Sequence, residues 1–192
     1  MRTLIAAAAL AFATPALASD YSDPPELRGE RGYLTNVEVA TFNGPVEAVI
    51  AALQTPETGV LAHVVRTDRI PAIEALEPIE GAFPEDGAVR RLIFADGSEV
   101  VERVLENSET RFAYQVWDFT SSSARALDHI RGEFLYEAVS ATETRVTWTY
   151  AIAPRAFFVR PFVRSYLEND FAPFMESGLQ GAAEAFNAER GS

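Results

Sequence analysis

Hydrophobic and polar residues alternate over short runs along most of the chain, a pattern typical of antiparallel strands that bury one face. In the clearest example one face of the run carries four large apolar residues: Val146, Trp148, Tyr150 and Ile152. The dipeptide Asp96-Gly97 separates two such runs and is a strong hairpin signal. The pattern predicts strands over 36–42, 73–79, 88–94, 99–105, 111–119, 130–139 and 145–152.

Other segments show apolar residues at the spacing of a helix, three to four residues apart. One helix follows Gly44-Pro45, where proline suits the first helical position, and its apolar stripe is Val46, Val49, Ile50 and Leu53. A second short helix is predicted over 57–65. The longest helical pattern covers 161–188, and Pro173 either kinks this helix or begins a second segment. A sheet with one apolar face needs a cover, and only the last helix is long enough.

The register of the predicted hairpin follows from charge. A three-residue loop over 95–97 places Leu92 opposite Val100 and Arg90 opposite Glu102. A two-residue loop instead places Arg90 opposite Arg103, and like charges directly across a strand pair are unfavourable. We therefore expect the three-residue loop, with Gly97 in the left-handed conformation.

The N-terminal segment differs from the rest of the chain. Residues 1–18 contain Arg2, a short apolar run and small residues that end at Ala18, which predicts a secretory signal peptide cleaved after Ala18. The apolar run is too short to cross a bilayer, so we expect no stable membrane anchor. The expected location is the bacterial periplasm. A polar, extended lead-in over 19–32 then precedes a single domain over 33–190.

Charge and missing residue types narrow the function. The net charge is −12 and every basic residue is Arg, so a nucleic-acid partner is not expected. The chain has no Cys, which excludes disulfides, thiolate zinc sites and iron–sulfur clusters. Its only histidines, His63 and His129, have no metal-ligand spacing, so we expect neither a metal nor another cofactor.

Several short strings, in this order of elements, resemble the helix-grip fold of the START and birch-allergen-like (SRPBCC) superfamily. Within it the chain is similar to the polyketide cyclase/dehydrase and lipid-transport group. The resemblance implies an α+β fold: an antiparallel sheet of about seven strands around a long C-terminal helix, two short helices after the first strand, and an internal cavity for an apolar ligand. The strings are 43–49, 87–90, 96–97, 101–103, 112–114, 144–148 and 178–179.

The candidate ligand-binding residues lie on the predicted inner face of this sheet. Arg90, Glu102 and Tyr114 form a polar cluster that orients a ligand. Alternatively, Arg90 and Glu102 form an ion pair that only fixes strand register, or a pair that lies outside in solvent. Trp148 and Tyr150 share the inner face of the last strand, as core aromatics or as cavity wall. Trp117 and Phe119 are candidates for the cavity rim. The expected cavity lining is Leu92, Phe94, Val100, Phe112, Val116 and Gly178.

Three functions fit these observations. The first is an exported carrier of a small apolar or amphipathic molecule. The second is a cyclase or dehydratase with Glu102 or His63 as the base and Arg90 or Tyr114 polarising an oxygen. The third is a non-catalytic interaction module. Because few titratable groups converge, binding is favoured over catalysis. The aromatic run over 157–162 has two interpretations: it inserts into a bilayer, or it packs in the core as the connection to the last helix. The sequence predicts no oligomeric state.

Overall fold

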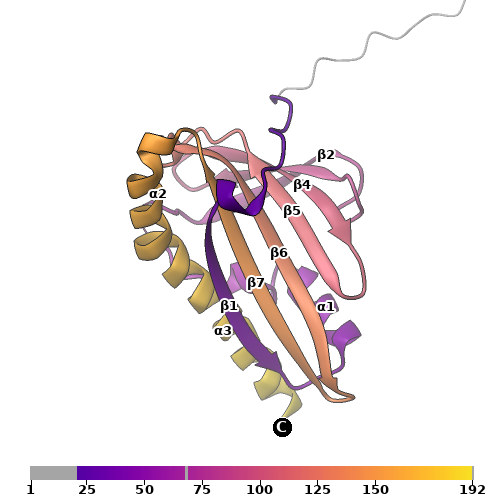
Figure 1. Ribbon diagram of the computed structural model, residues 1–192. Coiled ribbons are helices and arrows are strands. Elements are labelled where there is room, and N and C mark those ends of the chain that lie inside the picture. The colour runs from indigo at the N-terminus through magenta and orange to yellow at the C-terminus, as the bar shows by residue number, and fades with distance from the viewer. Residues whose placement is uncertain (1–20, 68, 192) are drawn as a thin grey trace, which may run out of the picture.

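One antiparallel sheet organises the computed structural model, which describes residues 21–67 and 69–191. The predicted signal peptide and its cleavage site after Ala18 lie outside the described residues. The strand order is β1-β7-β6-β5-β4-β3-β2, and every neighbouring pair is antiparallel (Figure 1). The strands are β1 (Leu34–Phe42), β2 (Ile73–Glu80), β3 (Val89–Phe94), β4 (Glu99–Asn107), β5 (Arg111–Trp117), β6 (Leu127–Ser140) and β7 (Glu143–Pro154).

Helices flank the sheet much as the periodicity predicts. Helix α1 (Val46–Gln54) begins one residue after Pro45, which is its N-cap and not its first helical residue. The second predicted helix is shorter than expected and consists only of the 3-10 turn η2 (Val60–Ala62). Gly59 precedes this turn, and a Cβ there would lie 2.5 Å from the carbonyl oxygen of Leu53, so the chain folds back tightly on the end of α1.

The predicted C-terminal helix is divided at the proline. Helix α2 (Arg160–Tyr166) continues into a π-helical turn, Leu167–Phe171, and then into α3 (Ala172–Arg190). Pro173 lies in the first turn of α3, where a missing N–H is tolerated, and the wide π turn precedes its ring. The prediction of a second segment at Pro173 is confirmed. Helix α3 packs against β1 and η2, at one side of the inner sheet face (Figure 1). The α+β helix-grip architecture is therefore confirmed.

The register of the β3–β4 hairpin is the one that charge predicts. Arg90 lies opposite Glu102 and Leu92 opposite Val100. Gly97 has a φ of 76°, the left-handed conformation that the three-residue loop requires. The Asp96 carboxylate accepts hydrogen bonds from the Ser98 hydroxyl at 2.6 Å and the Ser98 N–H at 2.9 Å, and these lower the pKa of Asp96. These hydrogen bonds and the conformation of Gly97 hold the loop in the shape that sets the β3–β4 register.

Aromatic rings cover the inner face of the sheet, and one glycine makes room for them. The Phe134 and Trp148 rings stack at 5.0 Å, and the Trp148 indole N–H donates to the Tyr114 hydroxyl at 3.1 Å. Gly132 lies between Tyr114 and Tyr150 in the strand register. A Cβ on Gly132 would come within 2.1 Å of the Tyr114 ring, so glycine is required for this ring to lie against the sheet.

The outer face of the sheet is partly covered by the N-terminal segment, residues 21–33. The Trp117 indole donates to the Ser22 carbonyl at 2.8 Å, and the Gln115 amide donates to the Pro25 carbonyl at 2.7 Å. The prediction that Trp117 rims the cavity is therefore wrong. Successive side chains in a strand point to opposite faces, so Trp117 follows the inward Val116 and points outward.

His129 joins this segment to the sheet. Its side chain is fully buried, with Nδ1 3.1 Å from the Asp128 carboxylate and Nε2 2.9 Å from the Tyr33 hydroxyl. Because a carboxylate only accepts hydrogen bonds, Nδ1 carries the proton of the neutral ring and Nε2 accepts from Tyr33. Burial lowers the pKa of His129 below its usual value of about 6.5, although Asp128 opposes this shift.

We expect this histidine to make the fold weaker in acid. A histidine whose pKa is lowered on folding binds protons more readily in the unfolded chain, so its contribution to stability is present above pH about 6.5 and is lost as the pH falls below that value. The His129→Gln variant should show a smaller drop in unfolding free energy between pH 7.5 and 5.5 than the unaltered protein, measured by urea denaturation. His63→Gln, which changes the other histidine, is the control. An unchanged pH slope in His129→Gln would contradict this account.

We also expect Gly132→Ala to destabilise the protein, because the added methyl group displaces Tyr114 from the sheet. Overpacking of this kind costs about 1–3 kcal/mol. Gly29→Ala is the matched control, since a Cβ there meets nothing within 4 Å and the change should stay within about 0.5 kcal/mol. Chemical denaturation measures both variants, and equal stabilities for the two would show that the Tyr114 ring can move without loss.

Candidate functional site

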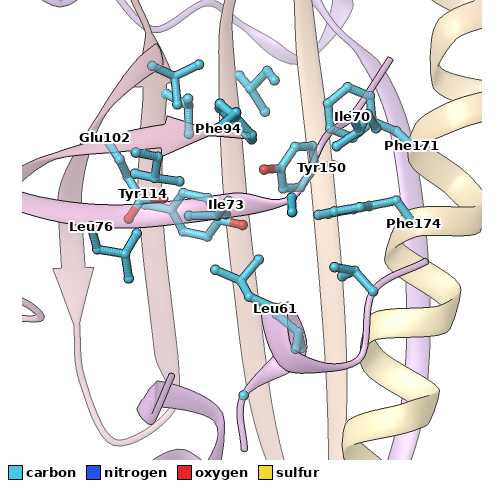
Figure 2. Close-up of a pocket in the computed structure, with 18 of the residues that line it drawn as sticks. Leu61, Ile70, Ile73, Leu76, Phe94, Glu102, Tyr114, Tyr150, Phe171 and Phe174 are labelled. Carbon is cyan, nitrogen blue, oxygen red and sulfur yellow. The ribbon is translucent and has the colours of Figure 1, made fainter. Parts of the chain in front are cut away.

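A cavity of about 500 Å³ lies between the inner face of the sheet and the helical elements (Figure 2). This volume is in the range of about 300–1,000 Å³ that is typical of small-molecule sites. Strands β2 to β7 supply one wall, while the segment after α1 and the start of the C-terminal helical region supply the other. Most of the wall is apolar, and the large side chains that form it include Leu61, Ile70, Leu76, Leu92, Phe94, Phe112, Phe134, Trp148, Phe171 and Phe174.

An ion pair occupies one part of this wall. The Nε and Nη2 atoms of Arg90 donate to the same oxygen of Glu102, Oε1, at 2.8 and 2.7 Å. The guanidinium carbon of Arg90 also lies 3.5 Å from the centre of the Phe83 ring. Glu102 lines the cavity and is only 5% exposed. Its second carboxylate oxygen, Oε2, has no hydrogen-bond partner among the described residues. One carboxylate oxygen thus remains available to a ligand.

Two tyrosines lie near this pair, and Figure 2 shows Glu102, Tyr114 and Tyr150, which belong to β4, β5 and β7, facing the same space. Burial raises the pKa of Tyr114 well above its ordinary value, and the nearby Glu102 charge adds to the effect. Burial and the same charge also raise the pKa of Tyr150. Both phenols are therefore neutral at physiological pH and can donate hydrogen bonds.

The pKa of Glu102 reflects two opposing causes. Burial raises it, because a carboxylate loses its hydration in the wall, while the Arg90 charge and hydrogen bond lower it. The ion pair and the two neutral phenols together make a polar site with balanced charge inside an apolar cavity. Such a site can orient a polar group of a ligand, or accept a proton at Oε2.

The cavity reaches the surface between the segment after α1 and the start of β2. Its exposed wall residues there are Thr55, Pro56, Arg66, Arg69 and Glu74. Arg69 forms an ion pair with Asp170 at 3.2 Å, and its carbonyl oxygen accepts a hydrogen bond from the Tyr166 hydroxyl at 3.2 Å. These contacts tie one side of the opening to the C-terminal helical region.

The structure brings most of the predicted site residues together in the cavity wall. Arg90, Glu102, Tyr114, Trp148 and Tyr150 all line it, and so do the predicted lining residues Leu92, Phe94, Val100, Phe112 and Val116. Phe119 also lines the cavity, in contrast to its neighbour Trp117. Strand alternation accounts for this agreement, because it assigns each residue to a face without reference to distant parts of the chain.

Two predicted residues lie elsewhere. Gly178 does not line the cavity: a Cβ there would lie 2.8 Å from Val64 and 3.1 Å from the Val60 carbonyl oxygen, so this glycine allows α3 to approach η2. His63 packs instead against Gly181 of α3, and its Nε2 atom is buried without a hydrogen-bond partner. His63 is therefore outside the cavity wall, and the assignment of a cavity base to it is wrong.

Other wall residues were not predicted from the sequence. Leu61 and Ile70 belong to the irregular segment between α1 and β2, which has no periodicity that assigns a side chain to a face. Phe171 and Phe174 could have been found, because they are aromatic residues on the apolar stripe of the C-terminal helical pattern. Across the described part of the chain, no group of three or more His, Cys, Asp or Glu side chains is arranged to hold a metal ion.

Comparison with solved structures agrees with the fold. The aromatase/cyclase ZhuI from a Streptomyces species is 17% identical, with a TM-score of 0.54 over 82% of this chain and 98% of its own. The major latex-like protein 151 of Panax ginseng is 15% identical, with a TM-score of 0.54 over 82% of this chain and 97% of its own. A protein from Thermus thermophilus is 17% identical, with a TM-score of 0.56 over 81% and 99%. Identities this low support the fold alone.

Sequence comparison is more specific. No curated protein matches the chain significantly. The model of one family, described as polyketide cyclase / dehydrase and lipid transport, matches residues 35–187. This match spans the sheet from β1 onward, the cavity wall and nearly all of α3. The chain therefore belongs to the polyketide cyclase/dehydrase and lipid-transport family of the SRPBCC superfamily.

Proposed function

We propose that this protein binds and carries a small hydrophobic or amphipathic molecule in its cavity. The observation that carries the proposal is the cavity of about 500 Å³, open on one side, with a largely apolar wall and a cluster of polar side chains around Glu102. Burial of an apolar ligand in such a wall is favourable by about 25 cal/mol per Å² removed from water. A non-catalytic module with a vestigial cavity would not need this volume.

The polar site favours a neutral polar group on the ligand, such as a hydroxyl or a carbonyl. The Arg90 charge is already paired with Glu102, and Tyr114 and Tyr150 are neutral donors. A ligand carboxylate placed here would meet the Glu102 charge without a free cation to balance it. A hydroxyl could donate to Oε2 of Glu102, and a carbonyl could accept from a phenol.

Catalysis by a cyclase or dehydratase is the second candidate, and one observation favours it. Oε2 of Glu102 has no protein partner among the described residues, and burial raises the pKa of this carboxylate, which makes it a stronger base. In this case Glu102 would accept a proton from a carbon next to a substrate carbonyl, and Tyr150 would donate a hydrogen bond to the carbonyl oxygen as it gains charge.

The carrier proposal predicts binding of N-phenyl-1-naphthylamine, a neutral dye whose fluorescence rises in apolar surroundings. Leu61→Trp fills the cavity and should weaken binding by at least about tenfold, equivalent to about 1.4 kcal/mol. Leu135→Trp adds the same ring at a side chain that is 42% exposed and outside the cavity wall, so it should leave the dissociation constant unchanged. Equal binding by both variants would place the dye elsewhere and contradict the proposal.

Two further measurements on the unaltered protein and its variants distinguish a carrier from an enzyme. Native mass spectrometry of protein purified from its host should show a co-purifying small molecule, whose amount falls in Leu61→Trp. Incubation with a poly-β-ketone thioester should leave that compound chemically unchanged. If the protein instead cyclises or dehydrates this compound, and Glu102→Gln loses that activity but still binds the dye, the protein is an enzyme and the carrier proposal is wrong.

We also propose that the protein is exported. The support is the three-part pattern of residues 1–18, with Arg2, an apolar run and small residues that end at Ala18. The mature protein should then begin at Ser19. N-terminal mass analysis of protein from the host tests this, with Ala16→Glu and Ala18→Glu together as the variant that blocks cleavage. A mature chain that retains Met1 or Arg2 would contradict export by this route.

A further inference from the structure

An exposed aromatic patch lies where β7 connects to the C-terminal helices, and the cavity does not account for it. The patch consists of Phe157, Phe158 and Phe162, which are 83%, 73% and 45% exposed. Phe157 and Phe158 belong to a 3-10 turn, Phe157–Val159, and Phe162 lies on α2, at the end of the molecule where α2 is seen in Figure 1. The core contacts of this connection are made instead by Val163 and Tyr166, which are buried.

The geometry of the patch shows that packing within the chain does not explain it. The Phe157 and Phe158 rings contact each other edge-on, with centroids 6.0 Å apart, and neither belongs to the hydrophobic core. The sequence left two interpretations of this run, insertion into a bilayer or packing as a buried connection. Because the rings of Phe157, Phe158 and Phe162 are exposed, they do not pack as a buried connection. Adjacent exposed aromatic rings are typical of an interaction site.

The charge around the patch is opposite to that of the whole chain. No Asp or Glu occurs between Glu143 and Glu168, although the net charge of the protein is −12. Arg155, Arg160 and Arg164 flank the three rings. The Arg155 side chain has no hydrogen bond or ion pair among the described residues, Arg160 donates to the Tyr33 carbonyl at 3.3 Å, and Arg164 is 4.0 Å from Glu168.

A second exposed arginine reaches the same place from another loop. The Arg155 N–H donates to the Ala126 carbonyl at 2.8 Å, and this brings the exposed Arg125 close to the patch. At an ionic strength of 0.15 M, charges are screened over about 8 Å, so the groups nearest the patch act most strongly on a contacting surface. Two carboxylates belong to this group, because Glu168 lies near Arg164 and Asp170 pairs with Arg69, and the remaining arginines leave an excess of positive charge.

The patch is continuous with the opening of the cavity. The Arg69 guanidinium lies 5.9 Å from the centre of the Phe162 ring and 6.0 Å from that of Tyr166. Arg69 and Tyr166 both line the cavity. A surface that covered Phe157, Phe158 and Phe162 would therefore lie next to the route by which a ligand enters.

We propose that this patch docks the protein onto an anionic lipid bilayer, with the three phenylalanines in the acyl region and the arginines at lipid phosphates. Aromatic side chains and arginines together suit the boundary between acyl chains and headgroups. Within the described residues no helix is long and apolar enough to cross a membrane, and the proposal is accordingly one of surface attachment. It goes beyond carriage, because it names the surface from which a ligand is taken or to which it is delivered.

Sedimentation with vesicles tests the proposal. The probes are vesicles of phosphatidylcholine alone and vesicles with about a quarter phosphatidylglycerol. Protein matured in its host should bind the anionic vesicles at least about tenfold more tightly than the neutral ones, and the preference should weaken with salt. Phe157→Ser with Phe158→Ser should lower this affinity at least about tenfold.

Matched controls are available elsewhere on the surface. Val37→Ser with Val39→Ser removes two side chains that are 51% and 48% exposed on β1 and should not change vesicle binding. Arg155→Gln with Arg164→Gln should reduce the preference for anionic vesicles, while Arg31→Gln with Arg145→Gln, which removes the same charge from two other exposed positions, should preserve most of it. Equal losses in patch and control variants would overturn the proposal.

Three further results bear on it. Absence of vesicle binding by the unaltered protein would overturn it. So would a concentration-dependent dimer, seen by light scattering and lost in the Phe157→Ser, Phe158→Ser variant, because the patch would then join two copies of the chain. The Phe157→Ser, Phe158→Ser variant should bind the dye in solution as tightly as the unaltered protein does. The two assays are therefore independent: a protein that binds dye but not vesicles contradicts docking alone, and one that binds vesicles but not dye contradicts carriage alone.

Discussion

The inner face of the seven-stranded sheet is wider than the one long helix that packs on it, and the cavity is the part of this face that α3 leaves uncovered. Helix α3 lies beside β1 and reaches the sheet through contacts such as that of Phe174 with Trp148, whose rings are 6.3 Å apart. Over β2 to β6 the opposite wall is made largely by the irregular segment between α1 and β2. Because that segment has no long helix to fill the space, an apolar volume remains there.

The same side chains give the cavity both its rigidity and its polarity. Arg90 and Glu102 lie opposite each other across β3 and β4, so the ion pair that supports strand register also places a charge-balanced group in the wall. Tyr114 lies against the sheet only because Gly132 has no side chain, and its hydroxyl is held by Trp148. Buried polar groups of this kind are sustained by their hydrogen bonds, which also restrict their movement.

Charge is distributed unevenly over the surface, and this separates two regions of the molecule. Acidic residues outnumber basic ones over the whole chain, whereas the stretch over 144–167 contains no Asp or Glu and includes Arg155, Arg160 and Arg164. On the outer face of the sheet the N-terminal segment covers Trp117 and Gln115 and meets the buried His129 through Tyr33. Among the described residues, the three exposed phenylalanines lie together where β7 connects to α2, and Phe162 contacts Arg69 at the cavity opening.

The sequence by itself determined the strands, the β3–β4 register and the inward residues of each strand, because alternation and the repulsion of like charges act between near neighbours. Alternation and charge placed Leu92, Val100, Phe112 and Val116 on one face of the sheet, and the family resemblance identified this face as the cavity wall, where all four lie. Only the tertiary structure decided the places of Gly178, His63 and Leu61. Whether a glycine on a helix faces an open space or a packed turn depends on the position of that helix, and an irregular segment has no periodicity to show which of its side chains point inward. The cavity volume depends on how much of the sheet α3 covers, and this is set by the tertiary packing of the helix against the sheet.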